Sequence, residues 1–251
     1  ILLPLIIIFT SALIAALFGL PSLSRRLTIT QLSWLLALAP LTAFGILFSY
    51  LPDLQANLIF TWKIRWLPSM GFDAAFYLDS LSCLFALLIT FIGTLIVIYT
   101  GQYFKGNPTA WRFLTFLLLF MGNMLGLVMA GDVLTLFVFW EGTSIVSFLL
   151  VAYNYKDEDA RRAGFKALFI TGGGGIALLV GFLIVGFTTG DTSFVTILGC
   201  GDLLRNSSLY PAMLVLIAIG AFTKSAQFPA HIWLPEAMSA PTPASAYPPR
   251  W

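Results

Sequence analysis

The sequence predicts an all-α polytopic membrane protein with about seven transmembrane helices. The chain is 59% hydrophobic and only 10% charged, and its mean hydropathy is +0.93. A soluble domain has about a quarter charged residues, so water is not the main solvent of this chain. Apolar stretches also recur at about 20 residues, the length a helix needs to cross a bilayer.

The apolar stretches are separated by residues that favour turns, such as Pro52 with Asp53 and Gly190 with Asp191. The first stretch has no basic segment before it, so we expect a spanning helix there and not a signal peptide. The connection around 62–76 is long and rich in aromatic residues, which suits a segment at the membrane interface. The predicted spans cover roughly residues 1–20, 30–51, 78–100, 111–130, 133–153, 165–188 and 209–230.

Lysine and arginine are divided unevenly between alternate loops, eight in one set and three in the other. Because cytoplasmic loops hold the excess of basic residues, we expect the N-terminus outside the cell membrane and the 154–166 loop in the cytoplasm. The eight are Arg25, Arg26, Lys105, Arg112, Lys156, Arg161, Arg162 and Lys166, and the three are Lys63, Arg65 and Arg205.

Several kinds of partner are not indicated. The net charge is only +2 and the basic residues are scattered, so the chain lacks the basic face of a nucleic-acid-binding protein. Cys83 and Cys200 have no CxxC or histidine spacing around them, which indicates neither a metal site nor a disulfide framework. Gly172–Gly175 lies inside an apolar span without the Lys-Ser/Thr of a phosphate loop, so we expect it to serve helix packing. We expect no cofactor.

Two charged residues lie inside predicted spans. Glu141 is about eight residues into the fifth span, roughly 12 Å deep, and Lys224 lies roughly 18 to 22 Å along the seventh. Both are therefore near the middle of a hydrocarbon core about 30 Å thick. A lone charge there costs from about 2.5 to 10 or more kcal/mol, so each group needs a partner, water or neutralisation.

This pair has the chemistry of a proton carrier. Burial favours the neutral form of an acid or an amine, whereas a nearby opposite charge favours the charged form. Moving one partner would therefore change the proton affinity of the other. The alternative is a structural salt bridge that locks the fifth span to the seventh. Buried ion pairs are poor stabilisers, and charges inside membranes are usually functional, so the sequence favours the carrier.

The segment after Lys224 predicts a discontinuous seventh helix. Pro229 removes an amide donor and clashes with the preceding turn, so the helix should kink or break just below the lysine. Broken helices are a common way to build ion sites within membranes. His231, the single histidine, lies on this break, and a pKa near 6.5 suits a proton relay. A structural, hydrogen-bonded histidine is the alternative.

Three stretches have a specific composition. They are Phe139-Trp140-Glu141-Gly142-Thr143-Ser144, the run from Thr223 to Met238, and Ala240-Pro241-Thr242-Pro243 with Ser245-Ala246-Tyr247. They resemble the signatures of antiporter-like membrane subunits, the superfamily that joins Mrp-type multisubunit cation/proton antiporters to the proton-pumping arm of respiratory complex I. The motif at 240–247, the uncharged glycines of the sixth span and His231 resemble the A subunit of Mrp antiporters most.

The resemblance implies a function and a domain organisation. The matching acid and lysine of the family form an ion pair at the start of a proton path, which implies these roles for Glu141 and Lys224, with His231 passing the proton on. It implies three N-terminal helices over 1–105 and an antiporter-like domain over 106–251, within the first of two inverted repeats. The partners would be other membrane subunits, protons and Na⁺ or another monovalent cation. We expect part of a secondary transporter and not an enzyme.

The sequence departs from the family after Tyr247. Family members continue with Leu-His-Ser-Ala-Thr-Met, whereas this chain has Pro248-Pro249-Arg250-Trp251, with Pro249 where a relay histidine is expected. We therefore expect an antiporter-like repeat that is truncated before its last helix. Two alternatives stay open: a proton-pumping subunit of complex I or of a membrane-bound hydrogenase, and a non-functional truncated fragment.

Overall fold

A computed structural model of the 251-residue chain describes residues 1–20, 27–56, 58–67, 72–237, 241 and 243. Arg25 and Arg26 lie outside the described residues, as do most of the motif predicted over 240–247 and Pro249 at the missing relay position.

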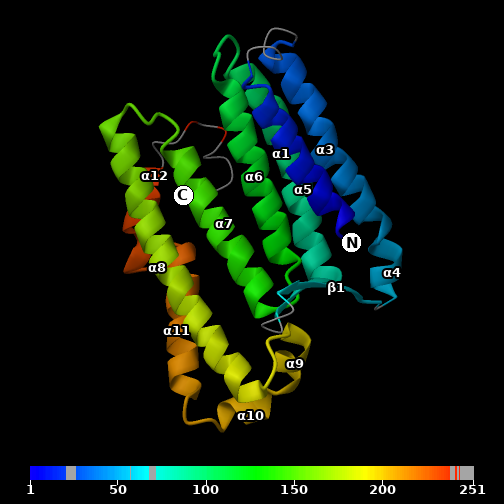
Figure 1. The fold of residues 1–251 in the computed structure, drawn as a ribbon, viewed down its shortest axis with the longest axis vertical. Helices are drawn as coiled ribbons and strands as arrows, with labels where there is room; N and C mark the ends of the chain where they lie inside the picture. Colours follow the sequence, from blue (N-terminus) through cyan, green and yellow to red (C-terminus); the bar gives the residue numbers. More distant parts are fainter. Residues whose placement is uncertain (21–26, 57, 68–71, 238–240, 242, 244–251) are drawn as a thin grey trace.

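Helices make up most of the structure (Figure 1). The elements are α1 (Leu3–Leu17), α3 (Ile29–Ser49), α4 (Leu51–Gln55), β1 (Phe60–Leu67), β2 (Phe72–Leu78), α5 (Ser80–Tyr103), α6 (Ala110–Val128), α7 (Val133–Val151), α8 (Glu158–Thr189), α9 (Phe194–Gly199), α10 (Gly201–Arg205), α11 (Tyr210–Lys224), η2 (Ala230–Trp233) and α12 (Leu234–Ala237). In the described part of the chain, five helical stretches are long and apolar enough to cross a membrane: residues 29–55, α5, α6, α7 and α8. The apolar helices α1 and α11 are shorter. Together they match the seven predicted spans, and the prediction of a multi-pass helical membrane protein is confirmed.

The helices form two groups that meet at α6 and α7. α1, α3, α5 and α6 pack against one another, and α8 packs between α7 and α11. Figure 1 shows α7, α8 and α11 side by side, away from α3 and α5. The buried apolar core belongs mainly to the first group and includes Phe113, Leu117 and Met121 on α6.

Short polar side chains set where several helices begin. The Asp79 carboxylate accepts the Ser82 N–H and the Ser82 hydroxyl accepts the Asp79 N–H, which forms a capping box at α5. Asp132 accepts the N–H groups of Leu134 and Thr135 at α7, and Asp157 caps α8. These caps satisfy backbone donors that have no partner within the helix.

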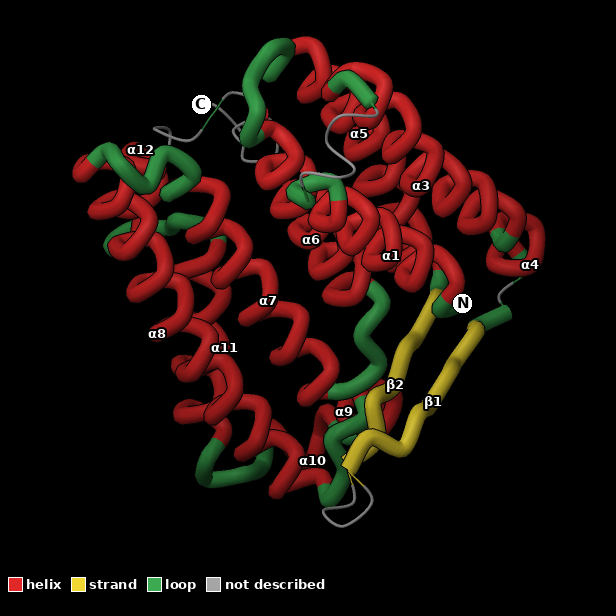
Figure 2. The backbone as a smooth tube through the Cα atoms, turned by 45° about the horizontal axis from the view of Figure 1, so that its top comes forward, coloured by secondary structure: helices red, strands yellow, loops and turns green. Residues whose placement is uncertain are grey.

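The segment predicted to lie at the membrane interface contains two paired antiparallel strands, β1 and β2, which no local pattern in the sequence predicted (Figure 2). β1 and β2 pair antiparallel from Phe60 opposite Leu78. The hairpin is joined to the start of α7, because the Ala75 N–H donates to the Asp132 carboxylate at 2.7 Å and the Gly131 N–H donates to the Ala75 carbonyl at 2.8 Å. A bridge between Asp132 and Ser193 adds the start of α9 to the same end of the molecule.

The seventh helix is discontinuous just after Lys224, as predicted, although the predicted span ran on to residue 230. α11 stops at Lys224, and the chain resumes with the 3₁₀ turn η2 and then α12. Ala226 has a left-handed φ of 51°, and the Gln227 N–H donates to the Phe222 carbonyl at 2.9 Å. This is a Schellman-type helix end, which closes the helix before the proline acts.

Candidate functional site

Glu141 lies eight residues after the start of α7 and faces the glycines of α8. A methyl group on Gly175 would collide with its Oε1 atom, and one on Gly172 would lie 3.7 Å from Oε2. The side chain is half-buried. Oε1 is buried and has no hydrogen-bond partner among the described residues. The acid is therefore held against α8 by shape, with one oxygen still able to accept a hydrogen bond.

Lys224 is the last residue of α11, and its side chain reaches across to α7. Its Nζ donates to the Thr143 hydroxyl at 2.6 Å, to the Ser144 hydroxyl at 2.9 Å and to the Trp140 carbonyl at 3.4 Å. Both hydroxyls donate their own protons to the Trp140 carbonyl, so their lone pairs are free to accept from the amine. Nζ also lies 5.4 Å from the centroid of the Trp140 ring.

Glu141 therefore belongs to the turn of α7 that Lys224 contacts, but the two side chains do not form an ion pair. Among the described residues, no nitrogen–oxygen distance of 4.0 Å or less joins them. The resemblance implied an ion pair, whereas in this structure the lysine binds the hydroxyls two and three positions after the acid. Both groups stay at the α7–α8–α11 interface.

The glycine run of α8 brings the three helices close together. A methyl group on Gly174 would collide with Thr223 on α11, and one on Gly220 of α11 would collide with Leu178 on α8. The glycines therefore serve helix packing, as predicted, and two of them also leave room for the Glu141 carboxylate.

His231 lies apart from this cluster. It is exposed in η2, and its ring stacks on Phe228 with 5.8 Å between centroids. Within the described ranges, no hydrogen bond or ion pair joins His231 to Glu141 or Lys224. η2 is nevertheless tied to the lysine end of α11, because the Trp233 indole donates to the Thr223 carbonyl at 2.9 Å.

Thr143 and Ser144, the direct partners of Lys224, were not predicted as site residues from the sequence. The available signal was two adjacent hydroxyls in an apolar span, following an acid by two and three positions. Asn123 of α6 was also missed. Its side-chain oxygen lies against Gly142, where a methyl group would collide with it. The Trp140 indole nitrogen is buried without a partner among the described residues.

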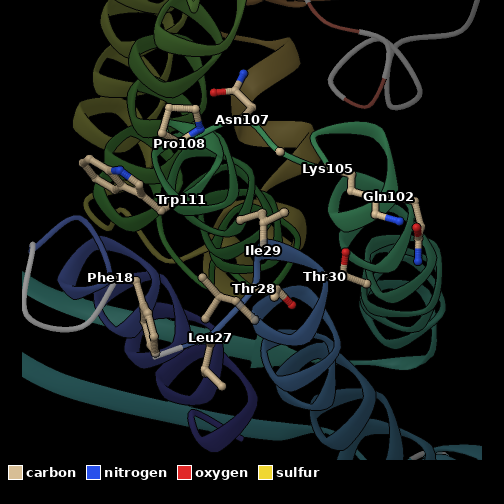
Figure 3. Close-up of a pocket in the computed structure, with 12 residues that line it drawn as sticks. Phe18, Leu27, Thr28, Ile29, Thr30, Gln102, Lys105, Asn107, Pro108 and Trp111 are labelled. Atoms are coloured by element: carbon tan, nitrogen blue, oxygen red, sulfur yellow. The ribbon is translucent and has the colours of Figure 1, made fainter. Parts of the chain in front are cut away.

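A cavity of about 750 Å³ lies elsewhere, between the ends of α1, α3, α5 and α6 (Figure 3). Thr28, Gln102, Lys105 and Trp111 are among the residues that line it. None of the described residues around it belongs to the predicted site, so the candidate site is an interface between helices and not this pocket.

The fold and the half-buried acid and amine define a class: a polytopic helical membrane protein with ionisable groups between its spanning helices. The family profile described as "NADH:quinone oxidoreductase/Mrp antiporter, TM" matches residues 130–247. The profile described as "NADH-Ubiquinone oxidoreductase (complex I), chain 5 N-terminus" matches residues 66–114. The chain belongs to this family of antiporter-like membrane subunits and corresponds to an N-terminal part of the A subunits of Mrp-type antiporters.

Two curated relatives illustrate the match. The chain is 42% identical over 239 residues to the A/B subunit of a probable K⁺/H⁺ antiporter of Rhizobium meliloti, which covers 95% of this chain and 23% of the relative. It is 43% identical over 215 residues to the A subunit of the Na⁺/H⁺ antiporter of Alkalihalophilus pseudofirmus, covering 85% of this chain and 27% of the relative. The chain thus spans about a quarter of the length of these relatives.

Two solved structures share the fold. A chain of the Mrp complex from Dietzia sp. superimposes with a TM-score of 0.84 at 32% identity, over 98% of this chain and 26% of that one. A chain of an archaeal membrane-bound sulfane sulfur reductase superimposes with a TM-score of 0.72 at 24% identity, over 95% of this chain and 48% of that one. The second likeness concerns the fold alone.

Proposed function

We propose that this chain is part of a membrane subunit of a multisubunit monovalent cation/proton antiporter, and that protons move through the interface of α7, α8 and α11. The observation that carries the proposal is the position of the Lys224 amine. Its amine lies on the Thr143 and Ser144 hydroxyls of the turn that also holds Glu141. An acid on this turn of α7 and an amine of α11 bound to the same turn can form a proton-exchanging unit, because charges inside membranes mark ion pathways.

The geometry fits the protonated lysine. An ammonium group has three donors, and the two hydroxyl oxygens accept two of them at 2.6 and 2.9 Å. The Trp140 carbonyl already accepts from both hydroxyls and is only a longer contact of the amine, at 3.4 Å. When the amine gives up its proton it becomes an acceptor, and a hydroxyl that rotates can donate to it. The hydroxyls therefore serve both protonation states without a large movement of the backbone.

Glu141 supplies the second half of the exchange. Its Oε1 atom, which has no hydrogen-bond partner among the described residues, is an acceptor available to a proton or to the lysine. A movement of the flexible lysine side chain from the hydroxyls toward this carboxylate would change the proton affinity of both groups, because opposite charges favour each other's ionised form. The discontinuity after Lys224 leaves the end of α11 free of a continuing helix.

The remaining parts of the proposal, the onward proton path and the partner subunits, are based on the relatives. We propose that His231 receives the proton beyond Lys224, on the segment that Trp233 ties to α11. The names of the relatives support export of Na⁺ or another monovalent cation in a hetero-oligomer with further membrane subunits. The basic residues at the α6, α7 and α8 ends support a plasma-membrane orientation with the 154–166 loop in the cytoplasm.

The test is cation-dependent proton movement in everted membrane vesicles. The aligned segment of this chain is grafted into the A subunit of the Alkalihalophilus pseudofirmus Na⁺/H⁺ antiporter, and the whole complex is expressed. We expect the graft to support exchange and Lys224→Ala to reduce it at least about a hundredfold, because loss of a positioned proton-transfer group costs roughly that much. Assembly is checked by co-purification of the other subunits.

Lys156→Ala is the matched control, because Lys156 lies exposed in the turn between α7 and α8. It removes the same charge and should leave exchange unchanged. Exchange at the unsubstituted rate in the Lys224→Ala complex would refute the proposal, and so would a graft that assembles but never exchanges.

A further inference from the structure

A second cavity, of about 240 Å³, lies where the start of α6, the end of α7 and the start of α8 meet. Two arginines, Arg112 and Arg161, line it together with Tyr153 and Tyr155, and its apolar side includes Phe148 and Phe165. No acidic residue is among the described residues that line it. The cavity therefore joins a cationic rim to an aromatic wall.

The two guanidinium groups are fixed in place by the chain itself. Arg112 donates to the Tyr153 carbonyl at 2.9 Å, and its guanidinium carbon lies 4.7 Å from the centroid of the Tyr153 ring and 5.2 Å from that of Tyr155. Arg161 donates to the Tyr155 carbonyl at 2.9 Å. These partners are neutral, so they orient both cations without forming an ion pair with them.

In the described part of the protein, no carboxylate lies within 4.0 Å of either arginine. The Nε atom of Arg112 is buried and has no hydrogen-bond partner among those residues. The next arginine along the chain, Arg162, pairs with Glu158 at 2.7 Å. Glu158 thus pairs with the arginine outside the cavity, and the two arginines that line the cavity retain donors for an anion.

An aromatic strip continues from the cavity along α8. Phe148 and Phe165 lie with 5.0 Å between ring centroids, and Phe165 stacks toward Phe169 at 6.3 Å. Phe169 is 75% exposed and Phe165 is 48% exposed. This strip lies along a helix long and apolar enough to cross the bilayer, so it gives a hydrocarbon chain a surface that starts at the arginines.

We propose that this cavity binds one acidic phospholipid of the cytoplasmic leaflet, with its phosphate on Arg112 and Arg161 and an acyl chain along Phe148, Phe165 and Phe169. Guanidinium groups bind phosphate through paired charge-assisted hydrogen bonds. Basic pockets between transmembrane helices on the cytoplasmic side are suited to anionic headgroups. The cavity lies at the same end of the bundle as the loops that hold most of the basic residues.

The test is native mass spectrometry of the purified 251-residue chain in a neutral detergent, with dioleoyl-phosphatidylglycerol and dioleoyl-phosphatidylcholine as competing probes. We expect one molecule of phosphatidylglycerol to be retained about tenfold or more in preference to phosphatidylcholine. Arg161→Gln should reduce that preference about fivefold, because one basic side chain near an anionic surface contributes about that factor. Arg112→Gln with Arg161→Gln should abolish it.

Arg162→Gln is the matched control and should keep the preference, because Arg162 already pairs with Glu158. Both arginines also hold a backbone carbonyl, but Arg161 is exposed whereas Arg112 is partly buried. Arg161→Gln is therefore the decisive single variant, and circular dichroism checks that each variant is folded. Equal retention of the two lipids, or an equal loss in Arg162→Gln and Arg161→Gln, would overturn the proposal. Displacement of the lipid by inorganic phosphate alone would also overturn it, since the site would then bind phosphate and not a lipid.

Discussion

Lys224 shows how a single residue finds its partner within a membrane. Its depth in the seventh span predicted a position next to Glu141, yet its amine binds Thr143 and Ser144. The acid turns instead toward α8, where Gly172 and Gly175 make room for it. Neighbouring positions of one helical turn point to different helices, so the sequence predicts the turn that holds the site but not which atoms meet.

Gly175 gives a prediction at this scale. Gly175→Ala should have a lower midpoint of thermal unfolding than Gly173→Ala, because its methyl group would collide with the Glu141 carboxylate and lie 3.3 Å from Cδ1 of Trp140, and overpacking typically costs about 1–3 kcal/mol. Gly173→Ala is the matched control, since no described atom lies within 4 Å of a methyl group there. Unfolding of both variants in detergent is followed by circular dichroism. Equal midpoints would contradict this account of the α7–α8 contact.

Asp191 gives a prediction about pH. Hydrogen bonds from the Thr196 hydroxyl at 2.6 Å and from the Ser193 N–H hold the pKa of the Asp191 carboxyl below its usual range. A carboxyl with a lowered pKa stabilises the fold above its unfolded value, roughly 3.9, and that contribution is lost as the pH falls through the folded value. Amide protection in α9 should therefore decrease on acidification, and Asp191→Asn should remove this dependence.

Hydrogen exchange measured by mass spectrometry at neutral and acidic pH, corrected for intrinsic rates, checks the Asp191 prediction. The amides of α10 serve as an internal reference, because they lie outside the hydrogen bonds of Asp191. Protection of α9 that falls equally with acidification in the unsubstituted chain and in Asp191→Asn would show that the carboxylate is not responsible.

At the scale of elements, the end of α11 decides where the lysine sits. Ala226 adopts a left-handed conformation that costs a residue with a Cβ atom roughly 1–2 kcal/mol, whereas glycine adopts it readily. Ala226→Gly should therefore raise the midpoint of thermal unfolding, and Ala226→Val should lower it. A lower midpoint for the glycine variant would contradict the assignment of this helix end.

The elements were predictable to different degrees for physical reasons. Spanning helices are recognised from the length of apolar stretches, which is local information, and all seven predicted spans have a matching helix. The hairpin of β1 and β2 depends on contacts with Asp132 and Gly131, more than fifty residues away, so no local pattern indicated it. Pro229 correctly indicated a break, but the backbone at Ala226 set its position.

At the scale of the whole molecule, the candidate site and the main apolar core occupy different helix groups. The core lies among α1, α3, α5 and α6, whereas Glu141 and Lys224 lie between α7, α8 and α11. Large apolar side chains on the second group remain exposed, including Phe169, Phe187 and Phe222. These faces are suited to contact lipid, or to contact the part of the relatives that this chain does not span. The chain spans about a quarter of their length. The division into residues 1–105 and 106–251 stays a prediction.

The measurement that tests the central claim most directly is exchange by the grafted antiporter complex carrying Glu141→Gln. Glutamine keeps the size of the side chain but cannot take up or release the proton. We predict that cation-dependent proton movement in everted vesicles falls at least about tenfold while the complex still assembles, and that Glu158→Gln in the exposed start of α8 has no effect. Unchanged exchange in Glu141→Gln would show that protons do not depend on this carboxylate and would contradict the account.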